Sequence, residues 1–167
     1  MSLQLGIPLF VVAALLQASL LPHLRVFGGQ PDLIVILVIA WSALDAEREG
    51  LVWAFVGGLF VDLFSGVPPG ISSLALLPVA FIVTLTEANL YRNNLLLTLP
   101  LAAAGALMYH VLYLILLRFL ADYPVAWASS LTYVTLPSVL FDVILMIPAL
   151  RLLLNWYDRL HPRQIRL

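Results

Sequence analysis

The sequence of 167 residues contains no cysteine and no lysine, and only 10% of its residues are charged. The lack of cysteine excludes disulfides, thiolate nucleophiles and thiolate metal sites. Eight basic residues, all of them arginine, and nine acidic residues give a formal net charge of −1. A charge balance so close to neutral offers no strongly basic surface that would recruit nucleic acid.

Apolar residues are abundant instead: they make up 63% of the chain, and the mean hydropathy is +1.06. A soluble domain averages about 45–50% apolar and about 25% charged residues. A bilayer is therefore the solvent that suits this composition. Inside lipid the backbone must satisfy its own polar groups, which leaves helices or a closed barrel. The apolar runs are long and continuous rather than alternating, so they favour helices.

Polar segments divide the chain into six apolar runs, which predict an all-α integral membrane protein. We expect one compact six-transmembrane-helix bundle over residues 1–167, with a loop at 121–130 and a cytoplasmic tail at 155–167. The expected helices cover about residues 3–21, 31–44, 51–64, 71–86, 95–120 and 131–154. The first run has no basic start and no small-residue cleavage pattern, so it reads as a retained helix and not as a signal peptide.

The second and third runs are shorter than the about 20 residues that a crossing requires. They either lie in the protein interior with local thinning of the bilayer, or form a hairpin that does not fully cross. Both cases leave the two termini on one side of the membrane.

Arginine placement predicts which side that is. With the N-terminus in the cytoplasm, six arginines lie on inner segments, and only Arg25 and Arg118 lie on outer ones. This satisfies the positive-inside rule, which the opposite orientation would violate. Trp127 and Trp156 also bracket the last run, as interfacial anchors do. We therefore predict that both termini face the cytoplasm.

Four polar side chains inside the apolar runs are candidates for a site. A charged residue at the centre of a spanning helix costs roughly 2.5–3.5 kcal/mol on insertion scales. Asp62 and Arg118 fall at matching depths near the outer ends of the third and fifth runs, so they could pair. Asp142 and His110 fall close enough in depth to hydrogen bond. These residues could form a proton relay or a substrate pocket, but interhelical ties are the favoured interpretation.

Glycines thin one face of the third run. The pair Gly57 and Gly58 would let another helix approach closely. That helix could belong to a partner protein, in which case the glycines mark a docking groove, or it could be a helix of the same chain. Pro68 and Gly70 most simply make a tight, rigid outer turn.

At this point the order of the motifs resembles a known family. Pro31-Asp32-Leu33 opens a short apolar helix, Arg48-Glu49-Gly50 follows, and GGLFVDLFSGVPPG comes next. The most specific part is the pattern G-x-x-x-D-x-x-S-G-x-P-x-G from Gly58 to Gly70, which includes Asp62, Ser65, Gly66 and Pro68. The pattern resembles MreD, a small multipass subunit of the bacterial rod-shape machinery, or elongasome. The last two runs match this family only in hydropathy, so no family role passes to His110, Asp142 or Arg118.

The resemblance implies a non-enzymatic scaffold without a cofactor, in the bacterial plasma membrane, that takes part in peptidoglycan elongation and cell shape. It implies binding to MreC, a protein with one membrane span, and through it to MreB, RodA and a penicillin-binding transpeptidase. It also implies a fold similar to the S subunits of energy-coupling-factor vitamin transporters. On this interpretation Asp62 and the following turn stabilise the outer half of the second to fourth helices. We also expect contacts with membrane lipids, and the sequence leaves open whether the chain forms homo-oligomers.

Three rival interpretations are weaker. A vitamin-binding transporter subunit would need a polar, ligand-sized cavity facing outside, and the short outer loops offer few hydrogen-bonding groups. An intramembrane aspartyl enzyme would need Asp62 and Asp142 in one site, yet they fall at different depths and lack a matching catalytic motif. A channel would need more polar residues than six such helices provide.

Overall fold

A computed structural model describes residues 3–25, 27–44, 49–85 and 95–160. Every regular element in these ranges is helical. The long helices are α1 (Leu3–Ser19), α2 (Leu33–Leu44), α3 (Glu49–Ser65), α4 (Ile71–Leu85), α6 (Leu95–Leu120) and α8 (Leu136–Leu160). Short elements are the 3-10 helix η1 (Leu21–Leu24), α7 (Trp127–Ser129) and the π-helical turn η2 (Ser130–Thr135).

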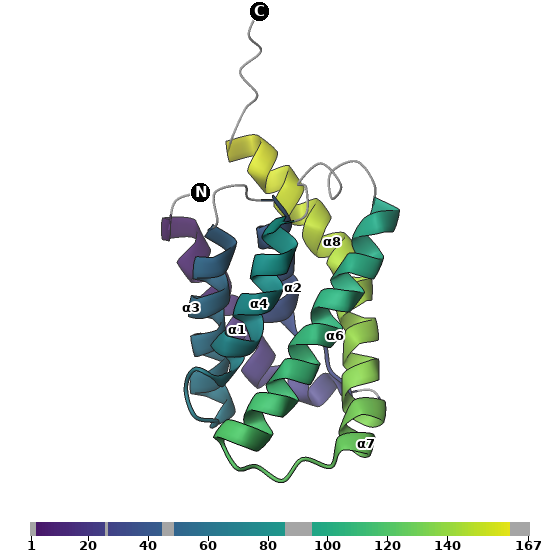
Figure 1. Cartoon of the computed structure of the whole chain (residues 1–167). Coiled ribbons are helices and arrows are strands. Elements are labelled where there is room, and N and C mark those ends of the chain that lie inside the picture. Colours follow the sequence, from purple (N-terminus) through teal and green to yellow (C-terminus); the bar gives the residue numbers. More distant parts are fainter. Residues whose placement is uncertain (1–2, 26, 45–48, 86–94, 161–167) are drawn as a thin grey trace, which may run out of the picture.

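The long helices run alternately in opposite directions and form one bundle (Figure 1). The start of α1 and the end of α8 lie at the same end of the bundle, and the turn between α3 and α4 lies at the opposite end together with α7 (Figure 1). This alternation agrees with the helix order that the apolar runs predict.

The short helix α2 is the centre of the bundle, because it contacts α1, α3, α4, α6 and α8. Eight apolar side chains of its 12 residues are buried, including Ile34, Val38 and Ile39 at 0–1% exposure. A helix that is apolar on all sides is expected to be surrounded by protein or lipid. The second apolar run therefore lies in the protein interior. Whether it crosses the bilayer stays a prediction.

An aromatic cluster closes the core between α1, α2 and α3. The rings of Phe10 and Trp53 stack with centroids 4.9 Å apart, and Trp41 meets Phe10 edge-on at 6.2 Å. All three side chains are at most 5% exposed. Aromatic pairs at these separations contribute beyond the area that they bury, by about 0.5–1.5 kcal/mol each.

Two helical stretches, Thr98–Leu120 and Trp127–Asn155, are long and apolar enough to cross a membrane. The four remaining long helices have 12 to 17 residues. These are shorter than the about 20 residues that an untilted crossing takes. Six complete crossings therefore stay a prediction.

The last helical stretch differs most from the sequence expectation. The predicted loop at 121–130 was wrong at its end, because helical structure begins at Trp127, and the predicted tail from 155 was wrong because α8 continues to Leu160. Ser129 lies in the part of the predicted loop that is helical, and its hydroxyl donates back to the Ala126 carbonyl at 3.0 Å. Thr132, inside the predicted last run, makes the same kind of bond to the Ala128 carbonyl at 2.7 Å. The first helix is also shorter than predicted, ending at Ser19 ahead of η1.

Candidate functional site

Asp62 lies three residues before the end of α3, and its side chain is only 2% exposed. Its carboxylate accepts hydrogen bonds from the Gly70 N–H at 2.7 Å and the Ser72 N–H at 3.1 Å. These amides belong to the start of α4, where helical N–H groups have no intrahelical partner. The helix dipole also favours a negative charge at this position. Asp62 therefore caps α4 from the neighbouring helix.

The expected ion pair between Asp62 and Arg118 is absent. Arg118 is exposed near the end of α6, and no salt bridge joins it to Asp62 in the part of the chain that the structure describes. Backbone amides compensate the buried carboxylate in place of a guanidinium group. Asp62 reaches these amides because they follow it by only eight and ten residues, and the short turn brings them close to its carboxylate.

The turn that carries these amides has the form that the sequence predicts. It covers residues 66–70 between the end of α3 and the start of α4. Gly66 and Gly70 have φ angles of +68° and +107°, a region that side chains with a Cβ rarely adopt. Pro68 is exposed, and the hydroxyl of Ser65 donates to the Val61 carbonyl at 2.6 Å. The motif thus closes the helix pair on itself.

Gly57 and Gly58 are both buried inside the bundle. A Cβ at Gly57 would lie 2.9 Å from the Phe10 ring and 3.1 Å from Ile34, and a Cβ at Gly58 would overlap the backbone of Ser73. The glycines therefore let α1, α2 and α4 pack close to α3. Of the two interpretations left open by the sequence, the internal crossing is right and the docking groove for a partner is wrong.

A second polar centre lies at the start of α2. Asp32 precedes the helix, and one oxygen of its carboxylate accepts hydrogen bonds from the Val35 N–H at 3.2 Å and from the Gln17 amide at 2.9 Å. The amide oxygen of Gln17 in turn accepts from the Ile34 N–H at 3.0 Å. Gln17 of α1 and Asp32, which directly precedes α2, thus satisfy the first amides of α2.

Helices α6 and α8 join this centre from the other side. Asp142 accepts a hydrogen bond from the Asp32 N–H at 2.6 Å, and its other oxygen lies 3.4 Å from His110 Nε2. The Ser138 hydroxyl accepts from the Gln30 N–H at 3.1 Å. The hydrogen bond that depth suggested between His110 and Asp142 is confirmed. Together these bonds tie α1, α2, α6 and α8, which is the interhelical role that the sequence analysis favoured.

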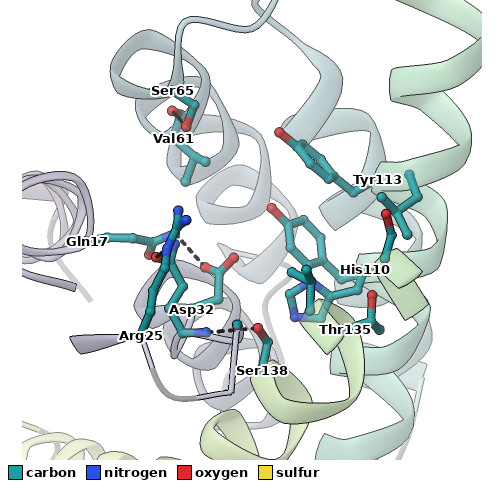
Figure 2. Close-up of a pocket in the computed structure, with 15 residues that line it drawn as sticks. Gln17, Arg25, Asp32, Val61, Ser65, His110, Tyr113, Thr135 and Ser138 are labelled. Carbon is teal, nitrogen blue, oxygen red and sulfur yellow. Dashed lines mark hydrogen bonds between the residues drawn. The ribbon is translucent and has the colours of Figure 1, made fainter. Parts of the chain in front are cut away.

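This centre forms the floor of a cavity of about 270 Å³. Figure 2 shows Gln17 and Arg25 on one side of it, His110 and Tyr113 on the other, and Asp32 between them. Its lining includes Asp32, directly before α2, and Ser130 and Thr135 of η2, so it lies toward the end of the bundle where α7 lies (Figure 1). The short outer loops predict no polar, ligand-sized cavity. The cavity is polar nevertheless, since most of its polar groups come from the helices.

Sequence reasoning missed part of this site. Gln17, Gln30 and Ser138 were not considered as site residues, and Arg25 was used only for orientation. The available signal was a polar side chain inside an otherwise apolar run, which Gln17 and Ser138 both present. That signal does not say which residues meet, because the pairs Gln30–Ser138 and Asp32–Asp142 lie more than a hundred positions apart in the chain.

Asp62 and Asp142 do not share a site. Asp62 binds the start of α4, whereas Asp142 binds Asp32 and His110. An aspartyl enzyme would need both to hold one water molecule, and these separate sets of partners give no such arrangement. Across the described residues, no three His, Asp or Glu side chains gather as a metal site would require.

Comparison with known proteins identifies one family. A family model described as rod shape-determining protein MreD matches residues 1–157. No solved structure matches the chain.

Proposed function

The chain belongs to the MreD family of rod shape-determining proteins, and from this premise we propose that it is a non-enzymatic scaffold of the bacterial cell-wall elongation machinery. It is a membrane protein with a role in rod shape determination. In our proposal it crosses the plasma membrane six times with both termini in the cytoplasm. It binds MreC through transmembrane and periplasmic contacts, and through MreC it reaches MreB, RodA and a penicillin-binding transpeptidase.

The observation that carries the proposal is the family match over residues 1–157. The distribution of apolar side chains supports a location inside the bilayer. Large apolar residues are 42–75% exposed along the outer faces of α1, α3, α4, α6 and α8, with examples at Val12, Phe55, Phe81, Leu107 and Leu140. In water such contiguous apolar surface would be a liability, whereas lipid tails solvate it.

A groove between α1 and α8, with α2 at its base, is the first place to test for the partner's helix. It is a hollow of about 270 Å³ lined only by aliphatic side chains, among them Val12, Ala13, Ile36, Ala149 and Leu152. Helix association in membranes depends on close van der Waals packing, and small residues such as the two alanines permit it. A single span laid in this groove would touch three helices at once.

The test is co-purification of this chain with MreC from membranes, using matched variants of α8. Leu152 lines the groove and is 70% exposed, while Leu140 lies outside it and is 64% exposed. Leu152→Trp should reduce the MreC recovered several-fold and round the cells, and Leu140→Trp should change neither. Failure of the unaltered chain to retain any MreC would refute the proposal.

The periplasmic contacts need their own test. Replacing residues 121–126 with a glycine–serine linker of equal length leaves the core of the bundle intact. We expect weaker MreC recovery and a partial loss of rod shape. Full retention of both would show that this loop makes no contact with the partner.

The polar cavity favours one alternative, a substrate-binding subunit of a vitamin transporter. Its volume of about 270 Å³ is close to the lower end of the range typical of small-molecule sites. Thermal stabilisation of the purified chain by a water-soluble vitamin, in the absence of MreC, would support this alternative. An unchanged melting temperature across a vitamin panel would reject it.

A further inference from the structure

The cavity beside Arg25 has a continuation. A second hollow of about 240 Å³ lies between α1 and α3, and it shares Gln17, Arg25, Gln30, Val61 and Ser65 with the first. Arg25 therefore borders both, and its Nε donates to the Gln30 side-chain oxygen at 3.1 Å. The two hollows together offer space for more than a few water molecules.

The charged groups around this space differ in the partners that hold them. Asp32 is held by the Gln17 amide and by an amide of α2, and the nearby Asp142 is held by the Asp32 N–H and by His110. Arg25 is different: among the described residues it forms no ion pair, and its hydrogen bond to Gln30 uses only Nε. The terminal nitrogens of the guanidinium group are free to bind an anion. Guanidinium groups suit phosphate because they can donate two parallel hydrogen bonds to it.

Groups that can bind hydroxyls line another wall of the first cavity, which adjoins the Arg25 side through Gln30. The second carboxylate oxygen of Asp32 and the Ser138 hydroxyl hydrogen have capacity beyond the bonds already described. The π-helical turn η2 adds Ser130 and Thr135 to the same wall. Such turns are rare and are frequent at functional sites. A ligand with an anion at one end and hydroxyls at the other would meet both walls.

The second hollow indicates where such a ligand comes from. Its remaining walls are apolar and mostly small, with Ala14, Ala18 and Pro22 from the α1–η1 side and Phe64 from α3. A hydrocarbon chain fits between such side chains, and a polar soluble molecule gains nothing from them. The second hollow thus has a mixed lining, because Gln17, Arg25, Gln30 and Ser65 are polar, whereas Ala14, Ala18, Pro22 and Phe64 form an apolar wall.

We propose that this double cavity binds a phosphate ester of a polyol, with the phosphate at Arg25 and the hydroxyls at Asp32 and Ser138. The phosphoglycerol headgroup of an anionic membrane lipid has this chemistry, and so does free glycerol phosphate. The apolar wall of the second hollow favours the lipid. This site is separate from the α1–α8 groove, so its test is independent of MreC binding.

The test uses the full-length chain purified in detergent micelles and examined by native mass spectrometry. The micelles receive equal amounts of phosphatidylglycerol, phosphatidic acid and phosphatidylcholine with identical acyl chains. We expect phosphatidylglycerol to be retained most, phosphatidic acid less and phosphatidylcholine least. Equal retention of all three lipids would overturn the proposal, and equal retention of the two anionic lipids would overturn its hydroxyl-binding part.

Matched arginine variants separate the cavity from general surface charge. Arg25→Gln should lower the affinity for phosphatidylglycerol about tenfold, since charge-assisted hydrogen bonds are lost. Arg25→Lys should recover part of it. Arg118 is also exposed but borders neither hollow, so Arg118→Gln should have no effect. Equal losses in the two glutamine variants would show that only surface charge attracts the lipid.

The source of the ligand is decided by competition. Free glycerol 3-phosphate at millimolar concentration is added to the chain loaded with phosphatidylglycerol. If the lipid is not displaced, the ligand is a lipid headgroup, as the apolar wall of the second hollow indicates. Displacement supports the same phosphate-ester chemistry with a soluble ligand.

Arg25 is exposed, so its variants are expected to fold, and an unchanged helical circular dichroism spectrum checks this.

Discussion

Replacing Asp62 by alanine should weaken the bundle at the junction of α3 and α4. The substitution removes the acceptor of two backbone N–H groups, those of Gly70 and Ser72. Hydrogen bonds to charged groups contribute about 1.5–3 kcal/mol each. Relief of the desolvation of a buried carboxylate offsets part of that loss. We therefore expect Asp62→Ala to lower the free energy of unfolding by about 3 kcal/mol, and Asp62→Asn, which keeps one acceptor oxygen, by about half as much.

The assay is unfolding of the purified chain in mixed micelles, titrated with dodecyl sulfate and followed by the far-ultraviolet circular dichroism of the helices. Arg118→Ala is the matched control, because the structure gives Arg118 no contact with Asp62. It should change the unfolding free energy by less than about 0.5 kcal/mol, as surface substitutions usually do. Equal losses in the alanine variants of Asp62 and Arg118 would refute the capping argument and restore the ion pair.

Three further predictions use the same unfolding assay. Gly58→Ala should lower the free energy of unfolding by about 1–3 kcal/mol because the new Cβ overlaps the backbone of α4. Gly105→Ala should lower it by less, since its Cβ would meet only side chains, at 3.1 Å or more. A larger loss for Gly105→Ala than for Gly58→Ala would contradict this packing. Asp142→Ala orphans a buried backbone N–H and should cost about 1–3 kcal/mol, while the exposed Leu140→Ala on the same helix should be near neutral; similar values for the two would show that the tie contributes nothing. Phe10→Ala empties the centre of the aromatic cluster and should cost about 3–5 kcal/mol, and a loss below about 1 kcal/mol would show that the cluster collapses to fill the space.

Helix positions were largely predictable because apolar runs of this length have few alternatives. The run at residues 95–120 coincides with α6, and the starts of the runs at 71 and 95 coincide with those of α4 and α6. The error before the last run covers residues 127–130, where the hydroxyl of Ser129 donates back to a carbonyl at the start of the helix. The sequence between the last two apolar runs was interpreted as a loop throughout.

The two polar centres show a different limit. The motif indicated that Asp62 is important, but the predicted partner, Arg118, was wrong, because the carboxylate binds the amides of Gly70 and Ser72. Hydropathy gives depth, and depth does not distinguish a guanidinium group on another helix from an amide in the next turn. The same depth argument made the His110–Asp142 contact possible, and this contact is present at 3.4 Å.

By itself the sequence determined that this chain is helical and suited to a membrane, since its composition leaves too little polar surface for water, and its motif around Asp62 already resembled the MreD family. Only the tertiary structure decided which groups meet: that Gly57 and Gly58 serve an internal crossing, and that Gln17, Asp32 and Asp142 gather beneath a cavity bordered by Arg25. Such contacts depend on how helices rotate and pack against each other. A one-dimensional pattern fixes the depth of a residue but leaves that rotation open.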